Sequence, residues 1–258
     1  MNQPDAGYAN FAVLVESLLP IIEAEGGEVD EVRDEVLKKA QSAFSDAVDV
    51  AIRAKLGLEG GPPETDKLAD ELWGEIEPLL RVGRGDWTLF WRQLTYVAAK
   101  YTPTKRGTEE CDSSDYDGMM MTLLGDNSDD TYPFYDTLSD ENRATLRAWI
   151  EKWHKTLTKC YQSNAKQSKE VTPPEEVMRL ANPKYTLKEW MLVEAYTKAD
   201  AGKSPGNPFT LSGDYSGVHE LFELIKDPYS EGTSENNKKY YCRAPDESLK
   251  AGGTAFMS

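Results

Sequence analysis

The sequence is poor in the residue types that build disulfide frameworks and zinc sites. Its 258 residues include only three cysteines and two histidines. Cys111, Cys160 and Cys242 are far apart, and no two of the five residues show the spacing of zinc ligands. We therefore expect neither a disulfide scaffold nor a zinc site.

Long hydrophobic runs are also missing. No uninterrupted apolar run approaches the roughly 20 residues of a membrane-crossing helix, so the sequence predicts no transmembrane segment. Residues 1–7 contain no Lys or Arg, so they show neither a secretory nor a mitochondrial presequence pattern. The expected location is intracellular, with mitochondria an option only if a presequence lies upstream.

Positive charge is scarce in the first half of the chain. Residues 1–141 carry 12 Lys or Arg against 30 Asp or Glu, whereas residues 142–258 carry 17 against 15. Binding to nucleic acid or to an anionic membrane needs clustered Lys and Arg. The net charge of −16 therefore predicts that neither is a partner.

Apolar residues recur at helical spacing along most of the chain, and no segment shows the alternation of a strand. The predicted fold is mainly α. We expect Pro20 to bend or end the first helix near Leu19, and Gly57 to stop the second. The predicted helices cover about 8–24, 28–56, 68–80, 86–100, 140–162, 186–201 and 215–226, and a further helix is predicted to begin at Thr172-Pro173-Pro174-Glu175.

Four regions follow from this pattern: helical residues 1–101, an acidic irregular insert at 102–138, helical residues 139–228 and a polar tail at 229–258. Asp86 is predicted as a helix N-cap, and Thr172 and Thr186 as the first residues of capping boxes. We expect the insert to protrude from a shared helical core and to be cut first by a protease.

Few motifs in the sequence suggest chemistry. It contains no phosphate-binding glycine loop and no nucleophile elbow. Asp115, Asp117 and Gly118 fit part of a calcium loop, but Leu124 stands where the bidentate Glu is needed. A solvated acidic loop is the preferred interpretation, and a calcium-responsive module is a weaker alternative.

Other single residues have plain structural interpretations. The Arg-Gly-Asp triplet that ends at Asp86 is interpreted as a turn between helices rather than as a cell-adhesion motif. His219 is expected to pair with Glu223 on a helix surface, and His154 to lie on a helix surface or at the edge of the core.

Several short segments stand out in order along the chain. They are Asn2-Gln3-Pro4 with Asn10-Phe11, the segment 53–58, the segment 85–90, Asn182-Pro183-Lys184-Tyr185 with Glu189-Trp190, Asp214-Tyr215, Pro228-Tyr229 and Tyr240-Tyr241. In sequence, order and spacing these segments resemble the selenoprotein O family, and together they extend over almost the entire chain.

This resemblance implies a fold, an activity and partners. Family members are protein adenylyltransferases with a protein-kinase-like fold, and they transfer AMP from ATP to Ser, Thr or Tyr hydroxyls with Mg or Mn. The family's catalytic, metal-binding and ATP-binding residues precede the Asn-Gln-Pro passage. The resemblance thus implies a C-terminal helical part without the nucleotide-binding half, with no catalytic, cofactor-binding or metal-binding residue.

In this interpretation the partners are an N-terminal kinase-like half and, in the intact enzyme, protein substrates. The motif residues at 2–4, 10, 182–185, 214 and 228–229 are expected to be structural. Many family members end in a Cys pair that this sequence lacks, so Cys242 stands alone. Phe11, Leu14 and Leu18 are expected to form an exposed apolar patch. The alternative is a stand-alone acidic helical interaction module without enzymatic activity.

Overall fold

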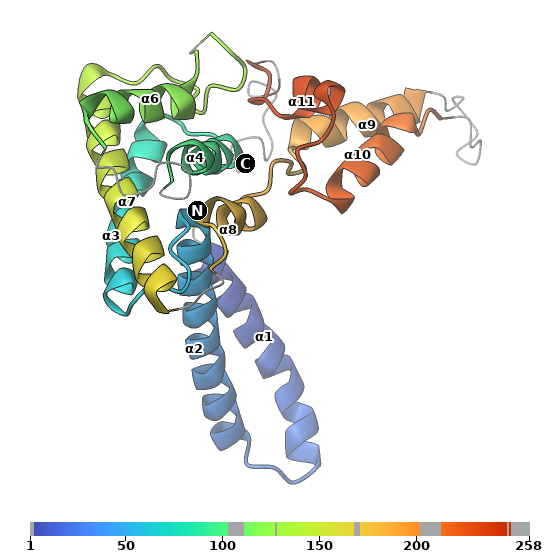
Figure 1. Ribbon diagram of the computed structural model, residues 1–258. Coiled ribbons are helices and arrows are strands. Elements are labelled where there is room, and N and C mark those ends of the chain that lie inside the picture. Colours follow the sequence, from blue (N-terminus) through green and yellow to red (C-terminus); the bar gives the residue numbers. More distant parts are fainter. Residues whose placement is uncertain are drawn as a thin grey trace. The chain divides into compact units, whose positions relative to one another are not determined.

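A computed structural model of the chain describes residues 3–102, 111–126, 128–167, 171–201, 213–246 and 248 (Figure 1). Within these ranges the regular secondary structure is helical, and one isolated β-bridge joins Gly85 to Phe134. The mainly α prediction is confirmed. The chain divides into two compact units, Met1–Arg53 and Ala54–Ser258.

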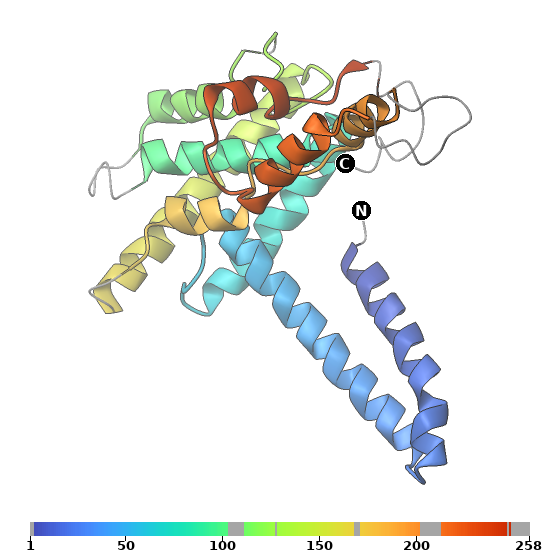
Figure 2. The ribbon, with the colours of Figure 1, turned by 90° about the vertical axis from the view of Figure 1, so that its right-hand side faces the viewer.

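The first unit is a helical hairpin made by α1 (Gln3–Ala24) and most of α2 (Val29–Leu56) (Figures 1 and 2). The rings of Tyr8 and Phe11 contact Phe44, with ring centroids 6.2 and 6.3 Å apart. Gly26, with φ +77, lies in the connecting turn. Helix α1 continues through Pro20, because losing one N–H donor does not outweigh the hydrogen bonds and packing on either side.

One helix has the length and composition of a membrane-spanning segment, although the sequence contains no long uninterrupted apolar run. Among the described residues, the Asp5–Ala24 segment of α1 is long and apolar enough to cross a membrane, with a mean hydropathy of 1.2. Isolated polar residues such as Glu16 interrupt the apolar run without lowering its mean hydropathy much. Core helices and signal sequences have the same composition, so this property by itself assigns no membrane role.

The second unit is built around α4 (Trp87–Tyr101), which has buried residues on all of its faces. Helix α4 packs against α6 (Ser113–Leu124) and α8 (Pro174–Ala181). Beside them, α3 (Glu64–Val82) packs against α7 (Asp140–Gln167). The indole N–H groups of Trp149 and Trp153 donate to the backbone oxygens of Leu72 and Leu56, at 2.8 and 3.0 Å.

The C-terminal part of this unit contains α9 (Glu189–Ala201), α10 (Ser216–Lys226) and α11 (Ser234–Tyr240). Helices α9 and α10 pack against each other (Figure 2). The buried residues of this part include Tyr185, Met191 and Leu221. The polar tail predicted at 229–258 contains the short helix α11, which the Thr233 hydroxyl caps by accepting from the N–H of Asn236.

The prediction of an irregular, protruding insert at 102–138 is wrong for residues 113–124. These residues form α6, which packs against α4 and α7. Its apolar residues at helical spacing, such as Tyr116 and Leu123, are buried between acidic ones. Asp112 and Asp115 form a capping box, so two of the acids stabilise a helix end. The predicted cleavage region begins in residues 103–110, which lie outside the described ranges.

The predicted helix starts have mixed outcomes. Asp86 is confirmed as an N-cap, since its carboxylate accepts from the N–H of Leu89 at 3.1 Å. The Thr172 capping box is wrong, because α8 begins at Pro174 after Pro173 without a side-chain cap. The Thr186 hydroxyl lies 2.9 Å from that of Thr88, and α9 begins only at Glu189.

Two glycines provide a test of the packing in the second unit. Gly57 has φ +73, and a Cβ there would lie 2.9 Å from Leu157. Gly57→Ala is expected to lower the free energy of unfolding by roughly 1–3 kcal/mol, measured by urea denaturation. Gly74 in α3 has open space around it, so Gly74→Ala is expected to raise that energy by about 0.5–1 kcal/mol. Equal shifts for both variants would contradict this packing.

Candidate functional site

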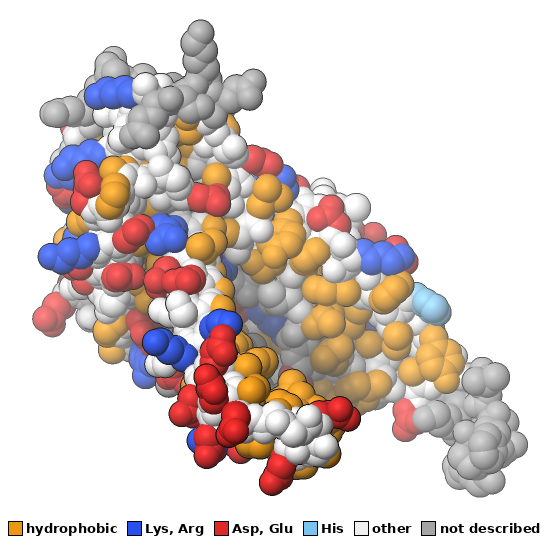
Figure 3. All heavy atoms as spheres, turned by 90° about the horizontal axis from the view of Figure 1, so that it is seen from below, with side chains coloured by type: hydrophobic (Ala, Val, Ile, Leu, Met, Phe, Trp, Pro, Cys, Tyr) orange, Lys and Arg blue, Asp and Glu red, His pale blue; other side chains and the backbone are white. Residues whose placement is uncertain are grey.

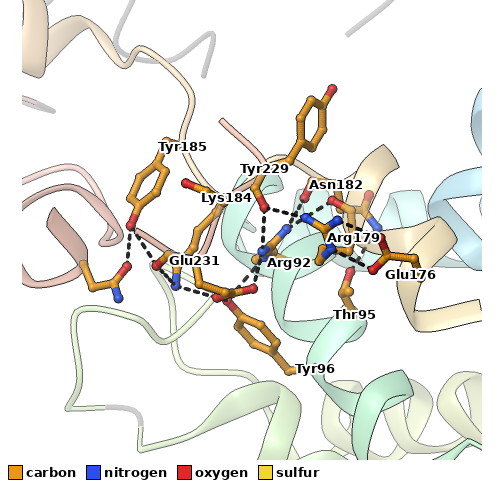
Figure 4. A network of polar contacts seen from close by, with 12 residues as sticks. Arg92, Thr95, Tyr96, Glu176, Arg179, Asn182, Lys184, Tyr185, Tyr229 and Glu231 are labelled. Carbon is orange, nitrogen blue, oxygen red and sulfur yellow. Dashed lines mark hydrogen bonds and ion pairs between the residues drawn. The ribbon is translucent and has the colours of Figure 1, made fainter. Parts of the chain in front are cut away.

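The most elaborate polar site among the described residues surrounds Arg92 on α4 (Figure 4). We name it the Arg92 cluster: Arg92, Tyr96, Asn182, Lys184, Tyr229 and Glu231. The Arg92 side chain is fully buried. It donates to the backbone oxygens of Arg179, Asn182 and Tyr229 at 3.2, 2.9 and 3.1 Å, to the Tyr96 hydroxyl at 3.3 Å, and to the Glu231 carboxylate.

Glu231 forms the exposed side of the cluster, whereas the Lys184 side chain is buried. The Lys184 ammonium group donates to the side chain and to the backbone oxygen of Glu231, each at 2.9 Å. The Tyr96 hydroxyl donates to the same carboxylate at 2.7 Å. One carboxylate thus pairs with two cations, and it ties the segment after α10 to α4 and to the loop before α9.

Asn182 connects the cluster to the end of α2. Its side chain is fully buried and donates to the backbone oxygen of Lys55 at 3.1 Å and to the Thr95 hydroxyl at 3.2 Å. The Lys55 ammonium group donates to the backbone oxygen of Ala181 at 3.0 Å and to the Asn182 side chain at 3.3 Å. Burial lowers the pKa of Lys55 to about 8.

A second buried ion pair lies nearby, at the start of α4. The side chains of Asp86 and Lys188 are each 6% exposed, and they form a salt bridge. Lys188 also donates to the backbone oxygen of Cys242 at 2.9 Å. Asp86 therefore caps α4 and holds the segment before α9, which excludes it from recognition by an external adhesion partner.

The cluster changes the acidity of its members. Burial opposes ionisation of Glu231, but hydrogen bonds from Lys184 and Tyr96 and the charge of Arg92 outweigh it and lower its pKa. For Tyr96, burial dominates and raises the pKa to about 12. The ionised form of Glu231 and the neutral form of Tyr96 are thus favoured at neutral pH.

This arrangement is suited to holding segments together rather than to catalysis. The cations of the cluster are engaged by internal acceptors, and no group of three His, Cys, Asp or Glu among the described residues is placed to bind a metal ion. The cluster joins α4, the loop before α9 and the turn after α10 across long separations in sequence. Removing one partner would leave buried polar groups unsatisfied.

The structure brings together only some of the motif residues expected from the sequence. Asn182, Lys184 and the Tyr229 carbonyl lie in the Arg92 cluster, and the Pro228 carbonyl accepts from the N–H groups of Lys184 and Tyr185. Pro183 lies between these residues in the sequence. Asp214 stands apart and accepts from the N–H of Ser216. Gln3 and Pro4 open α1, Asn10 is exposed on it, and Asn2 lies outside the described residues.

Arg92 and Glu231 were missed by the sequence reasoning. One signal for Arg92 was present: it is a cation flanked by the apolar residues Leu89, Phe90, Trp91 and Leu94. Such a residue needs buried acceptors. Nothing local in the sequence indicates that Glu231 supplies one of them.

The remaining candidates have structural surroundings. The Asp117 carboxylate lies 2.9 Å from the Arg147 guanidinium group, so an ion pair within the chain engages this candidate calcium ligand. His154 is 6% exposed with its ring nitrogen 2.8 Å from the Tyr101 carbonyl, as expected for a residue at the edge of the core. His219 is exposed, and Glu223 pairs with Lys226. None of the three cysteines forms a disulfide bond.

The chain is similar to curated proteins that are protein nucleotidyltransferases. Those relatives are named protein nucleotidyltransferase YdiU, which confirms the resemblance to the selenoprotein O family. The protein of Pseudarthrobacter chlorophenolicus is 28% identical over 232 residues, which are 89% of this chain and 36% of that relative. The protein of Vibrio vulnificus is 24% identical over 95% of this chain and 39% of the relative.

The protein of Xanthomonas campestris is 25% identical over 100% of this chain and 40% of that relative. The chain therefore spans between a third and two-fifths of the length of these curated relatives. No protein-family model matches the chain.

The buried guanidinium of Arg92 can be compared with an exposed one. Arg92→Met removes the donor from several buried acceptors, so it is expected to cost about 3–5 kcal/mol of unfolding free energy. The cost of Arg92→Lys should lie between zero and the cost of Arg92→Met, because an ammonium group has fewer donors than a guanidinium group. Arg81, which pairs with Glu77 at the surface, is the control, and Arg81→Met should cost less than about 0.5 kcal/mol. Similar urea midpoints for Arg92→Met and Arg81→Met would refute the central role of Arg92.

Glu231 is expected to contribute to the pH dependence of stability. Its pKa is lowered in the folded chain from the ordinary 4.5, so its stabilising effect is present above that pH and is lost as the pH falls through the folded value. Glu231→Gln should flatten the loss of unfolding free energy between neutral and acid pH. Glu77→Gln is the surface control. If the unfolding free energy of the wild type and of Glu231→Gln falls equally at acid pH, Glu231 is not the source of that fall.

Proposed function

We propose that this chain is the C-terminal helical part of a protein adenylyltransferase of the selenoprotein O kind, and that it supports a nucleotide-binding half with a protein-kinase-like fold. The intact enzyme would transfer AMP from ATP, with Mg or Mn, to Ser, Thr or Tyr hydroxyls of proteins. The motif residues of the Arg92 cluster would then have a structural role in this supporting part.

The main support is the way the chain matches its relatives. Similarity covers 89–100% of this chain but only 35–40% of proteins named protein nucleotidyltransferase. Motif segments that are far apart in the sequence also meet in one cluster, where Asn182 and Lys184 hold α4 and the turn after α10 together. A supporting helical part accounts for both observations.

The described residues do not fit ATP and its metal ion. Nucleotidyl transfer needs cations and metal ligands directed at the phosphates. Arg92 and Lys184 are directed at internal acceptors, and Lys188 is held by Asp86. No nucleotide-binding or metal-binding role is therefore assigned to a residue of this chain.

AMP transfer tests the proposal directly. The 258-residue chain, incubated with Mg or Mn and ATP labelled on the α-phosphate, is expected to incorporate no label and to show no ATP-dependent thermal shift. After co-expression with the part of the P. chlorophenolicus relative that it does not match, label should appear on protein. ATP labelled on the γ-phosphate is the control, because AMP transfer leaves that label in pyrophosphate.

The outcomes separate the two candidate functions. Label transfer by the chain alone would contradict the proposal. If neither the chain alone nor the co-expressed pair transfers label, and the chain captures a basic protein, the stand-alone interaction module is favoured. The support for that module is the excess of acidic residues in 1–141. The coding DNA upstream of Met1 gives an independent check, since an in-frame kinase-like segment there supports the proposal.

A further inference from the structure

Helix α1 is apolar over a wider arc than its partner helix covers. Tyr8 and Phe11 contact Phe44 of α2, and Val15 and Leu19 are each 8% exposed. A second set of large apolar residues lies on an adjoining face and remains exposed. This set, which we name the outer face of α1, is Val13 (69% exposed), Leu14 (53%), Leu18 (46%) and Ile21 (62%).

The outer face has the composition of a buried surface. At 100° per residue, Ala6, Asn10, Ser17 and Ala24 share this side, so it carries no charged residue. The Ser17 hydroxyl donates to the backbone oxygen of Leu14 at 2.7 Å, so its polarity is satisfied within the helix. The acids Asp5, Glu16 and Glu23 lie on the opposite side. Helices that are apolar over so wide an arc are normally buried on more than one side.

We propose that the outer face of α1 is the docking surface for the nucleotide-binding part of the longer enzyme, an inference that rests on the proposed function. The occupant would correspond to the part of the relatives that this chain does not match, because the relatives are more than twice as long as the matched segment. A contiguous exposed apolar patch marks an interaction site.

The charge of the hairpin indicates which occupant fits. Residues 1–53 carry four Lys or Arg against eleven Asp or Glu, and acidic side chains crowd the end of the hairpin at the α1–α2 turn (Figure 3). A second copy or an anionic membrane would bring like charges together. A nucleotide-binding part needs Lys and Arg to hold the phosphates, so the acidic hairpin favours it over these two occupants.

Copurification tests this surface. The 258-residue chain is co-expressed with the tagged part of the P. chlorophenolicus relative that it does not match, and the amount retained on the tag is measured. Leu14→Glu and Leu18→Glu place a carboxylate in the apolar contact and should each lower retention about tenfold. Val82→Glu adds the same charge at a position 63% exposed on α3 and should leave retention unchanged. Circular dichroism verifies that each variant is folded.

Each outcome has a defined meaning. Docking on the outer face is overturned if the wild-type chain is not retained or if Leu14→Glu and Leu18→Glu bind as well as wild type. It is also overturned if light scattering shows a dimer that Leu18→Glu dissociates, or if the chain sediments with phosphatidylcholine vesicles. A complex that depends on the outer face but transfers no AMP counts against the proposed function alone. AMP transfer that both substitutions leave unchanged counts against docking alone.

Discussion

The buried guanidinium of Arg92 is the constraint on which the second unit depends. A charge removed from water needs acceptors for all its donors, and these acceptors come from the end of α8, the loop after it and the turn after α10. Because those segments lie about 90 to 140 positions further along the chain, they must be in place together. The Glu231 carboxylate then pairs with both Arg92 and Lys184 at the edge of the cluster.

This constraint also explains why the motif segments are polar although they are buried. Asn182 and Lys184 would be unfavourable in a purely apolar core, but here every polar group of their side chains meets a partner. The neighbouring pair of Asp86 and Lys188 follows the same rule. The motif segments therefore meet at a place that supports the fold.

The core of the second unit buries its apolar residues more completely than the first unit does. Trp91 and Trp153, on α4 and α7, are almost fully buried, whereas Tyr196 and Phe222 on α9 and α10 are exposed. The first unit is a hairpin of only two helices, which can cover one side of each helix and no more. The outer face of α1 follows from that geometry, and it confirms the expected exposure of Leu14 and Leu18, with Phe11 half-buried against Phe44.

The sequence by itself determined the helical class, most helix positions and the cap at Asp86, because apolar spacing and capping are local properties. It failed where local signals were mixed: acidic residues concealed the apolar stripe of α6, and Pro173 with Pro174 replaced the Thr172 cap. Only the tertiary structure decided the Arg92 cluster. Its bonds join residues far apart in the chain, and whether a charge is buried depends on which segments surround it, which no local pattern contains.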